Sequence, residues 1–312
     1  MAVFTPVEPA DAEPFIRRFG AGGLRELTPI AEGIQNTNYR VETNEGRFVL
    51  TLFEARTEVA SLPFCLDLTD HLAAKGLPTA RPLRDADGRS LGQLNDRPAA
   101  LLQWLEGAWR RDPSLADHAC AGAMLARLHL EASDFKAERS NPVGSAARRT
   151  LFDACALRAT GTDRTILDRC APWVEADPGR DLPRGAIHAD YFPDNVLFRG
   201  NAISGVIDFY YACTDALAYD LAIALSAWGF DSEGVAIPAA LEAFQAGYES
   251  LRPLNAAERH ALPALGAVAA TRFTLTRLHD RLYHDPSALV TPKDPAPFGR
   301  RLDWWTRMPV QT

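Results

Sequence analysis

The residues of this chain with the clearest chemical potential lie together in one short stretch. His188, Asp190 and Asn195 follow the spacing H-x-D-x-x-x-x-N, and Asp208 comes after two short apolar segments. Carboxylate and amide oxygens suit Mg²⁺, which proteins usually hold with one or two side chains together with substrate phosphates. A further carboxylate nearby can accept or orient the proton of an attacking hydroxyl. The stretch therefore predicts a phosphoryl-transfer site, with Asn195 and Asp208 as metal ligands and Asp190 facing the acceptor.

A β-hairpin is expected to bring the two metal ligands together. The apolar segments 196–198 and 203–207 are typical of short strands, and Arg199-Gly200-Asn201 supplies the turn between them. Closing this hairpin places Asn195 and Asp208 roughly opposite one another. Asp and Asn often serve as ordinary turn or cap residues, but the spacing and the hairpin together rarely arise by chance.

The composition favours a globular protein with a small-molecule partner. A hydrophobic content of 47% over 312 residues is ample for a buried core. The formal charge of −7 disfavours nucleic acid or an anionic membrane as a partner. No apolar run approaches the ~20 residues of a membrane span, the N-terminus does not resemble a signal peptide, and the five cysteines include no C-x-x-C pair. We expect a cytoplasmic protein with reduced thiols, either a monomer or a homodimer.

The first third of the chain predicts an antiparallel sheet. Apolar periodicity predicts a helix over 3–19, strands over 38–43 and 47–53, a helix over 62–74 and a strand over 97–105. Residues 32–38 then form the tip between the first two strands. A boundary is expected near residues 103–107, because helical patterns dominate after it.

The second part of the chain begins with a marked helix start. Asp112 is a natural N-cap and Pro113 suits the first helical position, while Asn255 with Glu258 resembles a capping box. His129 is interpreted as a packed, hydrogen-bonded core residue. Further helices are predicted over 146–157, 163–174, from 214 toward 228 with Asp220 as a possible cap, over 238–248, from 255 to about 283, and over 298–305.

Segments in both parts of the chain resemble the aminoglycoside phosphotransferase and choline kinase superfamily, and within it the homoserine kinases. They are E-G-I-Q-N-T-N-Y (32–39), V-L-T-L-F-E (49–54), L-P-F (62–64), I-H-A-D (187–190), D-N-V-L-F (194–198) and G-V-I-D-F-Y-Y-A-C (205–213). The resemblance implies an α+β, two-lobed protein-kinase-like fold: an N-terminal antiparallel sheet lobe (1–104) that binds nucleotide and a mainly helical C-terminal lobe (105–312) for catalysis and substrate. It also implies Mg²⁺-ATP-dependent phosphorylation of the side-chain hydroxyl of L-homoserine, a step of threonine biosynthesis.

The resemblance also implies roles for individual residues. Asp190 matches the catalytic base, Asn195 and Asp208 match the magnesium ligands, and Asp220 matches an acidic residue that braces the catalytic loop. The strand tip and the exit of the strand over 97–105 match nucleotide-binding segments. The implied ATP contacts are Gly33, Asn36, Thr37, Asn38, Gln103, Trp104 and Leu105.

One position departs from the protein-kinase pattern. The strand that would supply a lysine to the ATP phosphates reads Val49-Leu50-Thr51-Leu52, so Thr51 stands in its place. The homoserine kinase branch is similar in having threonine there. Our hypothesis is that Arg40, Arg56 or backbone N–H groups compensate the phosphate charge.

The acceptor site is expected to contain both signs of charge, because homoserine is a zwitterion. The candidates near the reaction centre are His188, Asp194, Tyr210 and Asp215. Arg272, Arg277 and Arg281 lie on a late helix that could face the site, although each is interpreted first as part of a solvated face.

Two rival functions stay open at this point. The same chemistry could act on choline, ethanolamine, an aminoglycoside or a sugar, and Tyr210, Tyr211 and Trp228 would suit a cationic acceptor. A nucleotide-binding pseudokinase that acts as an adaptor would explain the missing lysine. The joint presence of Asp190, Asn195 and Asp208 argues against that second alternative.

Overall fold

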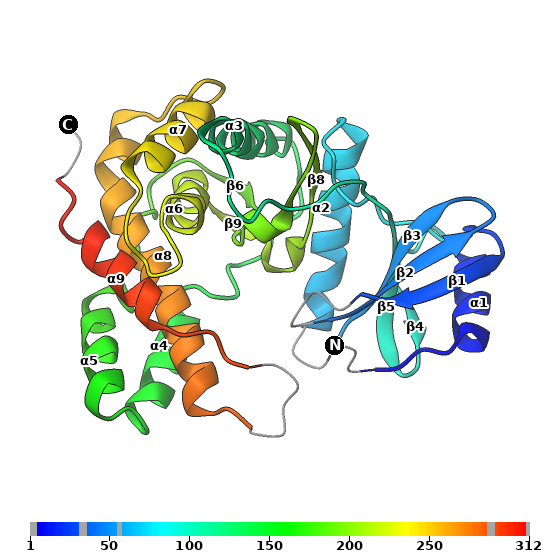
Figure 1. Cartoon of the computed structure of the whole chain (residues 1–312), viewed down its shortest axis with the longest axis horizontal. Helices are drawn as coiled ribbons and strands as arrows, with labels where there is room; N and C mark the ends of the chain where they lie inside the picture. The colour runs from blue at the N-terminus through cyan, green and yellow to red at the C-terminus, as the bar shows by residue number, and fades with distance from the viewer. Residues whose placement is uncertain (1–4, 31–35, 55–57, 286–290, 310–312) are drawn as a thin grey trace. The chain divides into compact units, whose positions relative to one another are not determined.

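The structure is a computed structural model that describes residues 5–30, 36–54, 58–285 and 291–309. The chain forms two compact units, of which the first comprises Met1–Gly107 with Ser204–Tyr210 and the second Ala108–Ile203 with Tyr211–Thr312. An N-terminal antiparallel sheet and a mainly helical remainder are present, so the predicted α+β class is confirmed (Figure 1). The lobe limits 1–104 and 105–312 stay a prediction.

The first unit is built on a five-stranded antiparallel sheet in the order β1-β2-β3-β5-β4. Because side chains alternate along a strand, neighbouring residues of β5 face opposite sides. Ala99 and Leu101 join the core beneath α1, whereas Ala100 and Leu102 join a second core beside α2. The elements are α1 (Pro9–Arg18), β1 (Leu24–Pro29), β2 (Thr37–Thr43), β3 (Arg47–Leu52), α2 (Leu62–Ala74), β4 (Gly92–Leu94) and β5 (Arg97–Gln103).

The predicted boundaries in this unit are largely confirmed. The helix predicted over 62–74 is observed as α2 with the same first and last residues. The two predicted paired strands correspond to β2 and β3. Helix α1 begins later than predicted, at Pro9, because proline is favoured in the first turn, where its missing N–H costs nothing. The strand predicted to reach residue 105 ends at Gln103.

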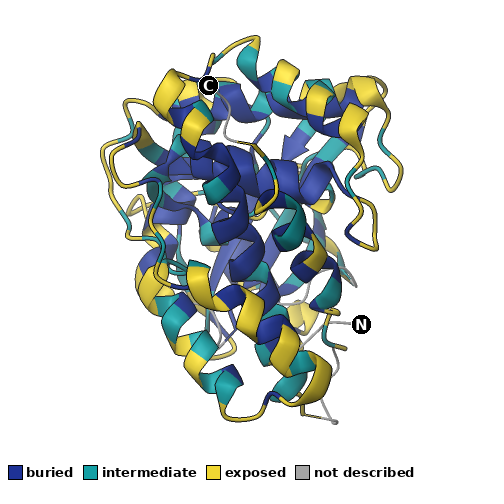
Figure 2. Cartoon of the chain, turned by 90° about the vertical axis from the view of Figure 1, so that its left-hand side faces the viewer, coloured by how far each residue is buried: buried dark blue, intermediate teal, exposed yellow. Residues whose placement is uncertain are grey.

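The second unit surrounds one buried helix, α6 (Leu217–Trp228). Every residue from Ala218 to Trp228 is buried, and Figure 2 shows the dark blue interior behind exposed outer helix faces. The other elements are α3 (Leu115–Glu131), α4 (Ser145–Ala156), α5 (Gly161–Cys170), β6 (Arg184–Ile187), β7 (Val196–Arg199), β9 (Cys213–Ala216), α7 (Pro238–Glu249), α8 (Ala256–Leu282) and α9 (Ala296–Trp305). Strand β7 pairs with β8 (Ala202–Val206), as the predicted hairpin requires.

Helices α3 and α7 pack closely because two glycines lie where they meet. A Cβ on Gly122 would clash with the carbonyl oxygen of Phe244, and one on Gly247 would clash with the carbonyl oxygen of Ala119. The approach of the two helices therefore depends on the absence of both side chains.

Three predicted features of the second unit need correction. The cap of α3 is Ser114 rather than Asp112, because the Ser114 hydroxyl and the Asp117 carboxylate form a reciprocal capping box. Residues 213–216 form strand β9, where a helix was predicted, since they pair with β6. Asp220 does not cap α6, because its carboxylate is bonded elsewhere. The capping box of α8, from Asn255 and Glu258, is confirmed.

Two further features bear on the class of protein. None of the helices in the described part of the chain combines the length and apolar character that crossing a bilayer requires. The five cysteines are free thiols, four of them buried and Cys120 exposed.

Candidate active site

The segment that carries Asp190 is a loop between β6 and β7. Strand β6 pairs antiparallel with β9, with Ile187 opposite Cys213, so the loop starts at a fixed point. Ala189 has a positive φ of 61°, a conformation that is uncommon for residues other than glycine and recurs at functional sites. The Asp190 side chain that follows keeps 21% exposure, so the turn leaves its carboxylate accessible.

Asp220, on α6, holds the backbone of this loop. One carboxylate oxygen accepts the N–H of His188 at 2.8 Å, and the other accepts the N–H of Ala189 at 2.7 Å. Nε2 of His129 lies 3.0 Å from Asp220, and both side chains are fully buried. Because an ionised carboxylate only accepts hydrogen bonds, Nε2 of His129 is the donor. The expectation that His129 is a bonded core residue is confirmed.

The bonded chain continues beyond His129. Nδ1 of His129 is hydrogen-bonded to the hydroxyl of Tyr248 at 2.8 Å, and this hydroxyl accepts a hydrogen bond from Arg252 at 3.0 Å. Arg252 in turn donates at 2.6 Å to Glu258, the capping-box residue of α8. Asp220 is thus oriented by a buried network that reaches the start of α8.

Side chains within the loop fix the backbone on either side of Asp190. The N–H of Asp190 donates to Nδ1 of His188 at 3.2 Å, and the Asn195 amide donates to the carbonyl of Asp190 at 2.9 Å. The indole of Trp228 donates to the carbonyl of Tyr191 at 3.0 Å. These bonds occupy backbone groups of the loop, whereas the carboxylate of Asp190 stays partly exposed.

Arg272, on α8, is the cation beside Asp190. It is 2% exposed, donates at 2.5 Å to the carbonyl of Ala189, and lies 3.9 Å from a carboxylate oxygen of Asp190. Its guanidinium also lies over the rings of Tyr211 and Phe273. The interpretation of Arg272 as a solvated residue is therefore wrong. The sequence did contain a signal, since Arg272 stands among apolar and small residues of α8.

The other two arginines proposed for the acceptor site, Arg277 and Arg281, have different partners. Arg277 donates to the backbone carbonyl of Asp294 at 3.3 Å. Arg281 pairs with the carboxylates of Asp163 and Asp294. The contacts of Arg281 do not involve the loop that carries Asp190, whereas the charges of Asp190 and Asp194 do act on Arg277.

Opposing effects set the pKa of Asp190. Burial raises this pKa above its ordinary value, the positive charge of Arg272 and the nearby His188 lower it, and the charge of Asp194 raises it again. The net shift is upward. A carboxylate with a raised pKa is a better proton acceptor, and the charge of Arg272 limits the rise.

The oxygen groups predicted to bind magnesium have suitable chemistry. The Asn195 amide nitrogen donates to the Asp190 carbonyl, so its amide oxygen is the group left to act as an acceptor or metal ligand. Asp208 follows β8 with a positive φ of 65°, in the first unit. A carboxylate and an amide oxygen are each groups that Mg²⁺ accepts together with water and phosphate. The chemistry of these two residues, one in each unit, therefore suits a magnesium ion.

The predicted nucleotide contacts lie in the first unit. Gly33 falls outside the described residues. The Asn36 amide oxygen accepts the N–H of Glu54 at 3.3 Å, and the Thr37 hydroxyl donates to the Glu54 carboxylate at 2.7 Å. The Thr51 hydroxyl donates to the Asn38 amide oxygen at 2.7 Å. The base of the tip is therefore fixed by side-chain bonds, and Thr51 contributes one of them.

The segment that follows β5 and the arginines proposed to compensate phosphate charge can be located in part. Gln103 ends β5, and its N–H donates to the carbonyl of Arg81 at 2.8 Å, while Trp104 and Leu105 follow it half-buried. Arg40 pairs with Glu26 at 3.3 Å and Glu42 at 3.5 Å. Arg56 lies outside the described residues.

The predicted acceptor contacts lie in different places. His188 is fully buried and Asp194 is exposed, both in the loop of Asp190. Tyr210 belongs to the first unit, where its ring packs edge-on against Phe53 at 5.1 Å. Asp215 pairs with Gly185 in the register of β6 and β9, so it lies toward the start of β6, whereas the Asp190 loop follows its end. The structure therefore does not bring Asp215 together with Asp190.

Known proteins share this sequence and fold. A model of the phosphotransferase enzyme family matches residues 26–254. The homoserine kinase of Methylocella silvestris is 49% identical over 306 residues, covering 97% of this chain and 95% of that protein. The homoserine kinase of Methylobacterium radiotolerans is 46% identical over 307 residues, with the same coverage of both chains.

Solved structures share the fold at much lower identity. Amicoumacin kinase, in complex with AMP-PNP and Ca²⁺, has a TM-score of 0.65 at 14% identity, covering 89% of this chain and 86% of that chain. The aminoglycoside phosphotransferase from Alicyclobacillus acidocaldarius has a TM-score of 0.63 at 15% identity, covering 97% and 93%. The predicted kinase-like fold is confirmed. The chain therefore belongs to the phosphotransferase enzyme family and, within it, to the homoserine kinases.

Proposed function

We propose that this enzyme transfers the γ-phosphoryl group of Mg²⁺-ATP to the side-chain hydroxyl of L-homoserine. The observation that carries the proposal is the similarity over 97% of the chain to proteins named homoserine kinase, at up to 49% identity. The loop geometry around Asp190 supplies the chemistry that such a transfer requires. The product, O-phospho-L-homoserine, belongs to threonine biosynthesis.

In the proposed reaction the homoserine oxygen forms a bond to the γ-phosphorus. The bond from that phosphorus to the β–γ bridging oxygen breaks, and ADP leaves with the electron pair. The carboxylate of Asp190 accepts the hydroxyl proton. Asp220 holds the N–H groups of His188 and Ala189, and the His188 ring accepts the N–H of Asp190, so positioning is the main contribution of these residues.

Asn195 and Asp208 are the proposed ligands of Mg²⁺, which neutralises phosphate charge when bound. Asn195 is oriented for this role by the hydrogen bond from its amide to the Asp190 carbonyl. Gly33, Asn36, Thr37 and Asn38 with the strand exit at Gln103 remain the proposed contacts of ATP.

The test is ADP release measured with Mg²⁺-ATP against L-homoserine, choline, ethanolamine, an aminoglycoside and no acceptor. Turnover with homoserine, reduced at least ~10²-fold in Asp190→Asn, is the expected result, since a general base typically contributes 10²–10⁴-fold. Turnover with another alcohol alone would replace the acceptor and keep the chemistry. ATP binding without turnover on any acceptor would favour the adaptor alternative.

A further inference from the structure

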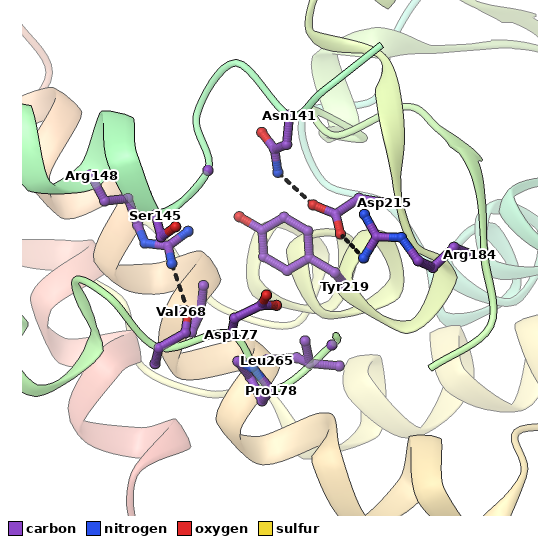
Figure 3. A pocket seen from close by; sticks show the side chains of 13 residues that line it. Asn141, Ser145, Arg148, Asp177, Pro178, Arg184, Asp215, Tyr219, Leu265 and Val268 are labelled. Carbon is purple, nitrogen blue, oxygen red and sulfur yellow. Dashed lines mark hydrogen bonds and ion pairs between the residues drawn. The ribbon is translucent and has the colours of Figure 1, made fainter. Parts of the chain in front are cut away.

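A polar cavity of about 170 Å³ lies in the second unit, separate from the loop of Asp190 (Figure 3). Neither Asp190 nor Asn195 lines it. Its walls come from α4, α6, α8, the segment 176–179 and the paired strands β6 and β9. The side chains that matter for its chemistry are Asn141, Ser145, Arg148, Asp177, Arg184, Asp215 and Tyr219.

Arg148 is a buried cation at one wall of this cavity. It is 4% exposed and donates to the carbonyls of Val174 at 3.1 Å and Ala176 at 2.7 Å. Within the described residues no carboxylate pairs with it at 4.0 Å or closer. Buried charges are normally paired. Burial lowers the pKa of this guanidinium, and the charges of Asp177 and Asp215 across the cavity offset only part of that effect. The site therefore suits an anion that comes from outside the chain.

Tyr219 places a second unpaired group at the same cavity. The side chain is 3% exposed, and its hydroxyl is buried with no hydrogen-bond partner in the described structure. In Figure 3 this hydroxyl points into the cavity, toward the side where Ser145 and Arg148 lie. Buried hydroxyls are usually bonded. A guanidinium and a phenol O–H facing one space are the donors that a carboxylate requires.

The two acidic residues of the cavity differ in how far they are already bonded. Asp215 accepts hydrogen bonds from Asn141 at 2.7 Å and from the N–H of Ala216 at 2.8 Å, and it pairs with Arg184 at 3.2 Å. Among the described residues, the one ion pair of Asp177 within 4.0 Å is a contact of 3.6 Å with Arg180, whose side chain is 77% exposed, and the charge of Asp177 also acts on Arg148. Asp177 is therefore the group that can still bind a cation.

We propose that this cavity binds a small zwitterion with the head group of an α-amino acid. Its carboxylate lies against Arg148 and Tyr219, and its ammonium group lies against Asp177. The ligand is small, because the cavity is below the roughly 300–1,000 Å³ typical of sites for drug-sized molecules. The proposal concerns a site other than the acceptor site of the proposed reaction and does not depend on that reaction.

The test is isothermal titration calorimetry on the full chain without nucleotide. The probes are glycine, L-serine and L-valine, with propionate and ethylamine as halves that lack the ammonium or the carboxylate. We expect the three amino acids to bind at least ~10-fold more tightly than either half, since each charged contact contributes on the order of a factor of ten.

Two variants examine the two ends of the ligand. Tyr219→Phe removes only the hydroxyl. It should weaken the binding of all three amino acids about tenfold, because the lost hydrogen bond is made to the charged carboxylate of the ligand. Asp177→Asn should weaken the binding of the amino acids and leave the affinity for propionate unchanged, because propionate has no ammonium group. Tyr283→Phe, in a tyrosine that does not line the cavity, and Asp190→Asn should bind as the unaltered chain does.

Two results would overturn the proposal. One is the absence of heat with every amino acid. The other is binding that Tyr219→Phe and Asp177→Asn leave intact, which would place the amino acids elsewhere. Because the readout is binding heat, failure here is distinct from failure of the acceptor panel, which measures turnover.

Discussion

His129 and Asp220 form a fully buried pair, with Nε2 of His129 3.0 Å from the carboxylate that holds the catalytic loop. Burial alone would raise the pKa of Asp220, but the hydrogen bond from His129 and the N–H of His188 hold that pKa below its ordinary value. The folded chain therefore binds fewer protons at Asp220 than the unfolded chain. This contribution to stability is present above the unfolded pKa and is lost as the pH falls through the lower folded value.

Asp220→Asn should consequently lower the free energy of unfolding at pH 7 by about 3–5 kcal/mol, the range for breaking a buried pair. The difference from the unaltered chain should narrow below pH ~4, where the carboxylates of the unfolded chain become protonated. Urea unfolding at several pH values measures both effects. Asp168→Asn, in an exposed pair with Arg164, is the control and should change little. An equal loss of unfolding free energy at every pH would contradict the lowered pKa of Asp220.

The pH dependence of catalysis should respond in opposite directions to two charges near Asp190. Asp194 raises the pKa of Asp190, so Asp194→Asn should move the acidic limb of kcat/KM to lower pH. Arg272 lowers the same pKa, so Arg272→Gln should move that limb to higher pH. Both profiles are measured at fixed Mg²⁺ and ATP. Shifts in the same direction, or none, would show that another group sets the limb.

Thr51 should matter through its hydroxyl. The Thr51 hydroxyl donates to Asn38 and bonds the hydroxyl of Tyr210, whose pKa is raised by burial and by Asp208. Thr51→Val keeps the shape but removes the hydrogen bonds of this hydroxyl to Asn38 and Tyr210, at a cost of about 0.5–1.5 kcal/mol for each bond. Since Asn38 is a proposed ATP contact, the KM for ATP should also rise.

The matched control for Thr51→Val is Thr28→Val, because Thr28 lies on β1 and bonds the exposed carboxylate of Glu26. That variant should retain stability to within ~0.5 kcal/mol, as most surface substitutions do. Thermal unfolding and ATP kinetics compare the two. Equal ATP kinetics in both variants would remove Thr51 from the nucleotide site.

The contact between α3 and α7 should be the least tolerant of added volume. Gly122→Ala places a methyl group against the Phe244 carbonyl and should destabilise by about 1–3 kcal/mol or more. Gly299→Ala, on α9, meets only Ile166 at 3.9 Å and should be neutral or stabilising by up to ~1 kcal/mol. Denaturant midpoints compare them. Similar midpoints would show that α7 can move away from α3 at little cost.

Local patterns predicted much of the fold because they record local physics. The alternation in β2 and β3, the periodicity of α2 and the Asn255–Glu258 capping box each need only neighbouring residues. Strand β9 was missed because its partner, β6, is distant in sequence and determines its conformation. The first cap was misplaced because Ser114, two residues after Asp112, has Asp117 at the reciprocal position.

In the candidate site, too, the local features could be predicted from the sequence and the long-range contacts could not. The spacing of Asp190 and Asn195 was readable because the loop is contiguous. The contact of Arg272 with the Ala189 carbonyl joins residues 83 positions apart, so no local pattern could give it. The buried network of His129 and Tyr248 is equally non-local. Long-range contacts, rather than motifs, decide which charges surround Asp190.

The bonds from Asp220 to the loop also determine how its amide hydrogens meet solvent. The N–H groups of His188 and Ala189 both end on a carboxylate within the buried helix α6, and both residues are fully buried. Deuterium can replace these hydrogens only when the loop separates from α6, an opening that approaches global unfolding in free energy. In hydrogen exchange these two amides should rank with the slowest of the core, so the proposed base Asp190 follows directly on one of the most persistent parts of the molecule.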